Sequence, residues 1–174
     1  MLKITLTGPE STGKTTLTKA LAKHYNTVYV PEYARNYIAT LNRKYTLNDI
    51  IHIAQQQAKL EDEWLPKANK ILFCDTDMLV TKVWCDYVFG ECPTYIKQAV
   101  NERHYDLSLL TYIDVPWVQD GLREHPNPRT RQTLFDTYYQ ALGLKKQVVM
   151  VLKGSHHTRM ETAITAIDTL LLNK

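Results

Sequence analysis

Eight consecutive residues near the start of the chain have the types and spacing needed to hold phosphate groups. They form a complete GxxxxGK[ST] pattern, Gly8-Pro9-Glu10-Ser11-Thr12-Gly13-Lys14-Thr15. Glycines at the first and sixth positions let the backbone curl tightly, so that successive N–H groups point at phosphate oxygens. Lys14 would reach the β- and γ-phosphates, and the Thr15 hydroxyl would bind Mg2+. The pattern predicts binding of a nucleotide's phosphates without saying which reaction follows.

Two carboxylates come directly after predicted strands, at the edge of a parallel sheet where ligands bind. Asp75 ends an apolar run, the position from which such proteins hold Mg2+ or its waters. Its alternative role is to cap the next helix, which Asp77 could equally do. Glu32 is a candidate general base for an acceptor hydroxyl, or else a carboxylate that stabilises the first turn of a helix. The sequence leaves open which carboxylate has which role.

Residues 117–131 are polar, contain three arginines and lack apolar periodicity. They fit a surface loop, and in a phosphate-binding protein they also fit a mobile lid. Arg123, Arg129 and Arg131 could then move over the γ-phosphate. Trp117 and Asp120 could stack on and hydrogen-bond a polar substrate that carries a ring; alternatively, Trp117 packs beneath the loop.

A second loop, residues 153–159, follows the last predicted strand and is expected near the base of the nucleotide. Gly154 permits close approach of the backbone, and Ser155 and Arg159 are candidate nucleotide contacts. The paired histidines at 156 and 157 have no third ligand at a suitable spacing nearby, so we predict no metal site there.

The elements that must position these residues alternate along the whole chain. Strands are predicted at residues 2–6, 27–30, 70–75, 107–113 and 147–152, several of them nearly continuous apolar runs. Helices are predicted at residues 14–24, 33–41, 47–68, 77–89, 94–104, 130–141 and 157–171. Thr46 is expected to cap the third helix and Gly143 to end the sixth. This alternation predicts an α/β fold with a parallel sheet flanked by helices.

Length and composition predict a single globular domain over residues 1–174. The net charge of +3 is spread along the chain, so we predict no nucleic-acid partner. No apolar stretch approaches the ~20 residues of a membrane span, so no membrane association is expected. Three cysteines without a CxxC pair, and a start that leads straight into a strand without a signal peptide, predict a cytoplasmic protein. The oligomeric state stays open.

These residues together resemble the kinase domain of the NadR-type nicotinamide riboside kinases, within the broader group of P-loop nucleoside and nucleoside monophosphate kinases. The resemblance covers nearly the whole chain. It is carried by GPESTGKTTL at 8–17, VPEYAR at 30–35, FCDTD followed by Thr81 at 73–81, DVPWVQDGLR at 114–123 and GSHHTR at 154–159. The combination of VPEYAR with PWVQDGLR points to this family, whereas the phosphate loop alone is generic.

The resemblance implies a five-stranded parallel sheet with an arginine-rich lid, and the use of ATP and Mg2+ to phosphorylate the 5′-hydroxyl of nicotinamide riboside. The product would be nicotinamide mononucleotide, in NAD salvage. Catalytic roles are then expected for Lys14, Glu32, Asp75 and Arg123, and contacts with this small-molecule substrate for Glu32, Arg35, Asp75, Trp117, Asp120 and Arg123. Nucleotide contacts are expected at Gly8, Glu10, Ser11, Thr12, Gly13, Lys14, Thr15, Thr16, Arg129, Arg131, Ser155 and Arg159, and metal contacts at Thr15 and Asp75.

The chain also departs from the family pattern. Better-known members carry an adenylyltransferase domain before the kinase domain, and some a DNA-binding region before that. Here the phosphate loop begins at Gly8 and no HxGH-type motif occurs, so we expect the kinase step alone. Two alternatives stay open: a kinase for another nucleoside or small metabolite, and a regulatory ATPase. The choice between ATP and GTP and any feedback regulation are also open.

Overall fold

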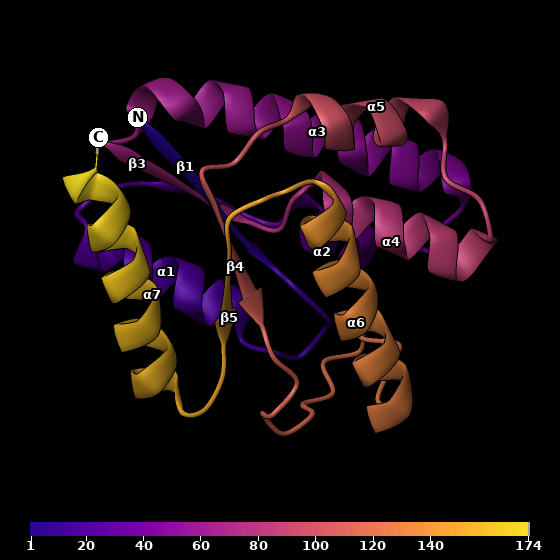
Figure 1. Cartoon of the computed structure of the whole chain (residues 1–174). Helices are drawn as coiled ribbons and strands as arrows, with labels where there is room; N and C mark the ends of the chain where they lie inside the picture. Colours follow the sequence, from indigo (N-terminus) through magenta and orange to yellow (C-terminus); the bar gives the residue numbers. More distant parts are fainter. Residues whose placement is uncertain (174) are drawn as a thin grey trace.

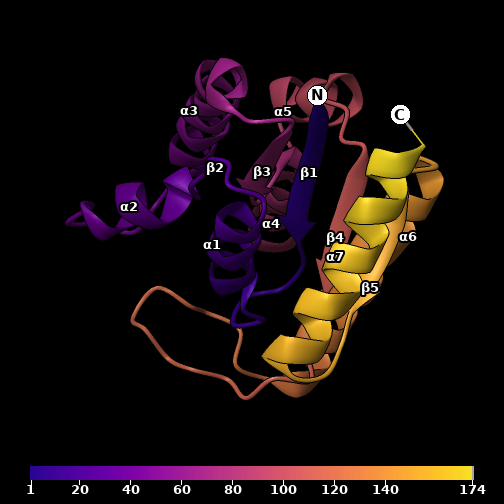
Figure 2. The ribbon, with the colours of Figure 1, turned by 90° about the vertical axis from the view of Figure 1, so that its left-hand side faces the viewer.

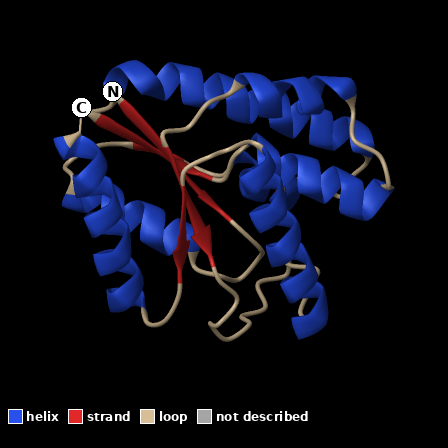
Figure 3. Ribbon diagram, in the orientation of Figure 1, coloured by secondary structure: helices blue, strands red, loops and turns tan. Residues whose placement is uncertain are grey.

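The computed structural model describes residues 1–173 and contains a five-stranded parallel sheet between two layers of helices (Figure 1, Figure 3). The strands are β1 (Leu2–Thr7), β2 (Tyr29–Val30), β3 (Ile71–Asp75), β4 (Leu107–Thr111) and β5 (Val149–Leu152). Their order in the sheet is β2-β3-β1-β4-β5. The predicted fold is confirmed, and β1, which leads into the phosphate loop, lies at the centre of the sheet.

The helices cover both faces of the sheet, as the apolar strands require. They are α1 (Lys14–His24), α2 (Tyr33–Ala39), α3 (Leu47–Trp64), α4 (Met78–Phe89), α5 (Thr94–Glu102), α6 (Pro128–Leu144) and α7 (His156–Leu172). Figure 2 shows α1 and α7 on the face of the sheet that is turned toward the viewer. On the other face, α3 packs on β2 and β3, and α4 and α6 pack near β4 and β5.

Strand β1 shows how the sequence assigns the two faces. Leu2, Ile4 and Leu6 are buried and pack against α1 and α7. The alternate residue Lys3 points to the opposite face, where its ammonium group pairs with buried Glu61 of α3 at 2.7 Å. Because side chains alternate along a strand, a slip of one residue would exchange these environments. The register of the central strand is therefore fixed, and with it the position of the phosphate loop.

Two helices end three or more residues away from their predicted ends, and both differences have local causes. The stretch predicted as one helix at 47–68 ends at Trp64 and continues as a short 3-10 helix, η1 (Leu65–Lys67), because Pro66 has no N–H to continue the α-helical pattern. Gly143 lies inside α6 instead of ending it. The chain leaves this helix at Lys146, which has the left-handed φ of 53° and donates its N–H to the Gly143 carbonyl at 3.0 Å.

The predicted helix start at Thr46 is confirmed. Thr46 and Asp49 form a capping box in which the Asp49 carboxylate accepts the Thr46 N–H at 2.7 Å. No helix among residues 1–173 has both the length and the apolar character of a membrane span. The three cysteines, Cys74, Cys85 and Cys92, are buried free thiols.

Candidate active site

The phosphate loop runs from the end of β1 to the start of α1, and two glycines permit its shape. Gly8 has φ 129°, and a Cβ atom at this position would lie 2.8 Å from the carbonyl oxygen of Thr111 at the end of β4. Gly13 has φ 84° and occupies the left-handed position immediately before α1. A side chain would be strained at either position, so the loop closes against β4 only because both residues are glycine.

Buried polar contacts hold the loop from beneath. The Thr12 hydroxyl bonds to the Pro9 carbonyl at 2.8 Å and lies 2.6 Å from the Thr111 hydroxyl. Arg159 of α7, only 2% exposed, donates to the Thr12 carbonyl at 2.7 Å and pairs with Asp114. Arg159 is not among the residues that line the cleft, because its guanidinium group bonds to backbone carbonyls below the loop and to the Asp114 carboxylate; its expected nucleotide contact stays a prediction.

Lys14 lies inside the cleft above this loop. Its ammonium group donates to the carbonyls of Gly8 and Pro9, each at 2.9 Å. Burial lowers the pKa of Lys14, while the neighbouring carboxylates act in the opposite direction, Glu32 most strongly and Asp75 next. These carboxylates favour the charged ammonium form of Lys14, the form that attracts phosphate.

Asp75 lies beside Thr15, just below the residues that line the cleft. Asp75 is 1% exposed, and its Oδ1 has no hydrogen-bond partner among the residues described. Burial raises the pKa of Asp75, and a hydrogen bond with the Thr15 side chain opposes that rise. The helix-capping alternative falls to the neighbouring Asp77, whose Oδ1 accepts the Val80 N–H at 3.0 Å. Asp75 thus has an uncommitted oxygen beside a hydroxyl group, a donor set that Mg2+ prefers.

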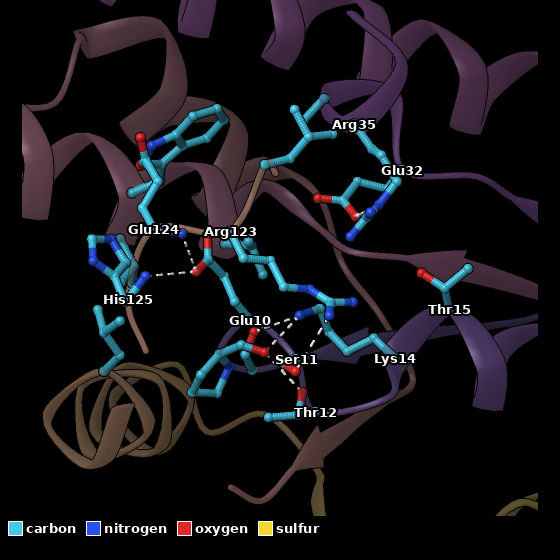
Figure 4. Close-up of a pocket in the computed structure, with 18 of the residues that line it drawn as sticks. Glu10, Ser11, Thr12, Lys14, Thr15, Glu32, Arg35, Arg123, Glu124 and His125 are labelled. Carbon is cyan, nitrogen blue, oxygen red and sulfur yellow. Dashed lines mark hydrogen bonds and ion pairs between the residues drawn. The ribbon is translucent and has the colours of Figure 1, made fainter. Parts of the chain in front are cut away.

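Glu32 precedes α2, and its side chain makes no capping hydrogen bond with that helix. The carboxylate instead lines the cleft, 26% exposed, with its Oε2 3.8 Å from the Arg35 Nε (Figure 4). Burial raises the pKa of Glu32; Lys14 opposes the rise and Asp75 adds to it. The structure thus leaves Glu32 available for a ligand in the cleft instead of committing it to the helix end.

Arg35 links this carboxylate to the loop that crosses the cleft. Its Nη1 donates to Asp120 at 2.6 Å, and Asp120 in turn lies 3.2 Å from the Nε of Arg123. The hydrogen bond from Arg35 lowers the pKa of Asp120. Asp120 is absent from the residues that line the cleft, so its part is to hold the two arginines together.

The loop between β4 and α6, residues 112–127, is called the lid loop below. It reaches from the end of β4 across the carboxyl edge of the sheet toward α2 (Figure 2). The predicted lid at 117–131 runs too far, because α6 begins at Pro128 and includes two of the three arginines. Only Arg123 lies in the loop and lines the cleft, and its Nη1 is 3.4 Å from the Ser11 hydroxyl.

The other two arginines do not reach the cleft. Arg131 is 5% exposed; it donates to the Ser11 carbonyl at 3.3 Å, and its guanidinium lies 5.6 Å from the Trp117 ring centre. Arg129 is exposed in the first turn of α6. Both belong to α6 and neither lines the cleft, so their expected contact with the γ-phosphate stays a prediction. Trp117 packs beside Arg131, outside the cleft lining, which matches its alternative role as a packing residue.

Two further residues predicted to contact the nucleotide, Ser155 and Thr16, lie outside the cleft lining and at its edge, respectively. Ser155 caps α7 by accepting the Thr158 N–H at 3.2 Å, and it is not among the residues that line the cleft. Thr16 is exposed and lies at the edge of the cleft.

A set of aromatic and apolar residues facing the phosphate loop escaped the sequence analysis. Its core is a stripe on α4 at helical spacing, Val80, Val83, Trp84 and Tyr87. Tyr45 completes it: the Trp84 Nε1 donates to the Tyr45 hydroxyl at 3.1 Å, and the ring centres are 5.0 Å apart. This aromatic wall (Tyr45, Val80, Val83, Trp84 and Tyr87) makes the far side of the cleft suitable for a flat organic ring.

The sequence family is decided by a model described as an AAA domain, which matches residues 3–159. The chain belongs to this family. This AAA-domain chain is also similar to the trifunctional NAD biosynthesis/regulator protein NadR of Salmonella typhimurium and of Escherichia coli. It is 33% identical to them over 124 and 126 residues, respectively. Each match covers 69% of the chain but 30% of the relative, so the chain spans less than a third of the relatives' length.

Solved structures similar to this AAA-domain chain include a NadR protein in complex with NR. Its TM-score is 0.80 at 25% identity, over 95% of this chain and 50% of that one. A NadR structure with NAD and AMP-PNP gives 0.77 at 25% identity, over 95% and 48%. Thymidylate kinase from Ehrlichia chaffeensis gives 0.66 at 16% identity over 97% and 98%, which shows a shared fold alone. The predicted resemblance to NadR is confirmed.

Proposed function

We propose that the chain transfers the γ-phosphoryl group of ATP to the 5′-hydroxyl of nicotinamide riboside, giving ADP and nicotinamide mononucleotide. The observation that carries this proposal is the cleft itself, in which Lys14 and Glu32 lie between a phosphate loop and an aromatic wall. The similarity to a NadR protein in complex with NR supports nicotinamide riboside as the acceptor. The similar NadR structure with AMP-PNP supports ATP as the donor.

The phosphate loop and Lys14 would bind the triphosphate. Its negative charge would draw the Lys14 ammonium from the two loop carbonyls that it contacts in the structure. Lys14 would accelerate the transfer because its positive charge lies where negative charge develops in the transition state. Arg123, held at the rim by Asp120 and Ser11, would add a second positive charge from the lid loop.

Thr15 and Asp75 would hold Mg2+, because the unpaired Asp75 Oδ1 and the adjacent hydroxyl fit its preference for oxygen ligands. When bound, Mg2+ neutralises phosphate charge and fixes the geometry of the triphosphate. Among residues 1–173, no group of three or more His, Cys, Asp or Glu side chains could hold a metal ion. The remaining ligands would therefore come from phosphates and water, which is common for Mg2+.

Glu32 is our candidate for the general base. It lines the cleft, makes no capping bond and carries a raised pKa, so a hydroxyl proton could pass to its carboxylate as the oxygen attacks phosphorus. Asp75 is the weaker candidate, because it lies below the cleft lining and bonds with Thr15. We therefore propose that Glu32 takes the proton and that Asp75 binds the metal ion.

The aromatic wall would receive the nicotinamide ring. Nicotinamide riboside carries a pyridinium cation, and the faces of Trp84 and Tyr45 favour a cation. Carboxylates of Glu32 and Glu124 also line the cleft and would balance this charge. Trp117 and Asp120 were the candidates from sequence, and the aromatic wall replaces them in this role.

A substrate panel tests the acceptor. Purified protein with Mg-ATP should phosphorylate nicotinamide riboside with a kcat/KM at least about tenfold above that for uridine, cytidine or thymidine, which lack the cationic ring. A better rate on a neutral nucleoside would overturn the acceptor assignment and leave a nucleoside kinase. ATP hydrolysis that no acceptor changes would favour a regulatory ATPase. We also propose a cytoplasmic location, which the three free cysteines support.

A further inference from the structure

Glu10 is an unusual residue for its position, because it places a carboxylate in a loop that binds phosphate. Its Oε2 accepts two hydrogen bonds from the backbone of the lid loop, from the N–H of Glu124 at 3.0 Å and of His125 at 3.2 Å. Figure 4 shows both bonds converging on the one carboxylate. Successive backbone N–H groups that point at one oxygen form an anion-binding arrangement, and here the anion is a side chain of the protein itself.

The next residue makes a second connection between the same two loops. The Ser11 hydroxyl accepts the Val118 N–H at 2.9 Å, and Arg123 approaches it at 3.4 Å. The lid loop is therefore attached to the phosphate loop at two points, near residue 118 and at residues 124–125. The charged acceptor is at the second point, and hydrogen bonds to a charged group are the stronger kind.

The residues that Glu10 holds also complete the acceptor side of the cleft. The Glu124 carboxylate accepts the Tyr45 hydroxyl at 2.6 Å. The His125 ring lies 4.8 Å from the Tyr87 ring, edge to face. Each lid residue thus has its backbone on the phosphate loop and its side chain on the aromatic wall. Glu10 consequently positions the two lid-loop residues that complete the acceptor side of the cleft.

The negative charge of Glu10 disfavours the binding of nucleotide phosphates in the same loop. Its carboxylate is close enough to contribute to the raising of the Lys14 pKa that opposes the effect of burial. The same negative potential acts against a triphosphate in the loop. A residue that only helped to bind nucleotide would not carry this charge, so the benefit must lie elsewhere, in the contacts with the lid loop.

We propose that Glu10 is a lid-positioning residue that binds the backbone of residues 124 and 125 and thereby builds the acceptor side of the cleft. Its loss should weaken acceptor binding and leave the binding of Mg-ATP unchanged or improved. The kinetic part of this inference rests on the proposed kinase function, whereas the position of the lid loop does not. The two parts therefore need separate measurements.

The first measurement is limited proteolysis, which needs no substrate. Trypsin cleaves after Arg123, and the attached lid loop should protect this bond. Glu10→Ala should give the fragments 1–123 and 124–174 about tenfold faster than the wild type, because two charge-assisted hydrogen bonds are lost. Glu10→Gln keeps an oxygen acceptor, and trypsin should cleave this variant within about threefold of the wild-type rate. Glu102→Ala, an exposed change on α5, is the matched control and should cleave at the wild-type rate.

The second measurement is steady-state kinetics of the same variants. Glu10→Ala should raise the KM for the acceptor about tenfold and change kcat much less. The Kd for Mg-ATP, measured by calorimetry, should stay equal or fall. Glu10→Gln should restore most of the acceptor KM. Hydrogen exchange of the wild-type protein gives a readout that needs no variant: the amides of Glu124 and His125 should exchange at least about tenfold more slowly than unprotected amides.

Unchanged cleavage at Arg123 in Glu10→Ala, or unprotected amides at residues 124 and 125, would overturn the inference. Faster cleavage with an unchanged acceptor KM would overturn the claim that the lid loop builds the acceptor side. If no acceptor is phosphorylated at all, the proposed function fails, and proteolysis together with hydrogen exchange still decides whether Glu10 holds the lid loop.

Discussion

At the scale of single residues, the account depends on Glu32 as the proton acceptor. Glu32→Gln keeps the size of the side chain and removes its basicity, so kcat should fall about a hundredfold or more. Wild-type turnover should also rise with pH through the raised pKa of Glu32, because only the carboxylate can accept a proton. That acidic limb should disappear in the variant. Steady-state rates between pH 5 and 9 give both results, and a turnover within about threefold of wild type would assign the proton elsewhere.

Trp84 tests the acceptor side at the same scale. Trp84→Leu preserves an apolar side chain and removes the indole that contacts Tyr45. The KM for the acceptor should rise about tenfold, the effect of losing one favourable ring–cation contact. The KM for ATP should stay within about twofold of wild type, because the phosphate loop is untouched. Trp64→Leu at the far end of α3 is the control, and equal effects of both changes would contradict the proposed ring site.

The part of the site that could be predicted from the sequence is the part built from local contacts. Gly8, Gly13, Lys14 and Thr15 lie within eight consecutive residues, and the strand–loop–helix setting is visible in the apolar pattern. The backbone bonds of Arg131 and Arg159 could not be predicted, because their partners, Ser11 and Thr12, are 120 and 147 residues away in sequence. Residue type alone cannot show that a guanidinium group is already bonded to distant backbone.

The aromatic wall illustrates a different limit. The α4 stripe has helical spacing, which indicates that one face of the helix is covered. Spacing cannot tell whether that face meets the core or a ligand cleft. The answer depends on the lid loop, whose residues 122–125 line the same cleft as α4 and the phosphate loop. Its sequence has no apolar periodicity that would predict this course. Because this loop has no periodic pattern, the predicted lid was too long and included the first turn of α6.

At the scale of secondary-structure elements, α4 carries four of the five residues of the aromatic wall and has a buried acid at its N-cap. Asp77 is 2% exposed, and burial raises its pKa from 3.8 to about 6; its bond from the Val80 N–H and the charge of Lys145 oppose the rise. The folded state therefore binds this proton more tightly than the unfolded state does. Its contribution to stability is full below pH 4 and is lost as the pH rises through 6.

Replacement of this acid tests the relation between α4 and pH. Asp77→Asn keeps an oxygen for the Val80 N–H and cannot ionise. The unfolding free energy of the variant minus that of the wild type should increase by about 1–3 kcal/mol when the pH is raised from 4 to 7.5. Urea unfolding at both pH values measures this gain. Asp136→Asn, an exposed change on α6, provides the comparison, and the same pH dependence in the two variants would show that Asp77 is not the cause.

At the scale of the whole molecule, the order β2-β3-β1-β4-β5 brings the working residues to one edge of the sheet. The phosphate loop follows β1, Glu32 follows β2, Asp75 ends β3 and the lid loop follows β4. Parallel strands point their carboxyl ends the same way, so residues that are distant in sequence share one cleft. The helices pack on both faces of the sheet, and the lid loop crosses its carboxyl edge.

The most direct test of the account is the fate of the γ-phosphoryl group. The protein, Mg2+ and ATP labelled in that group should convert nicotinamide riboside to a labelled mononucleotide, with one ADP formed for each product molecule. Mass spectrometry and phosphorus NMR can follow both products in one sample. Lys14→Ala, which loses the ammonium group in the phosphate loop, should slow the transfer about a hundredfold or more. Label that appears only in inorganic phosphate, at a rate that the riboside does not change, would contradict the account.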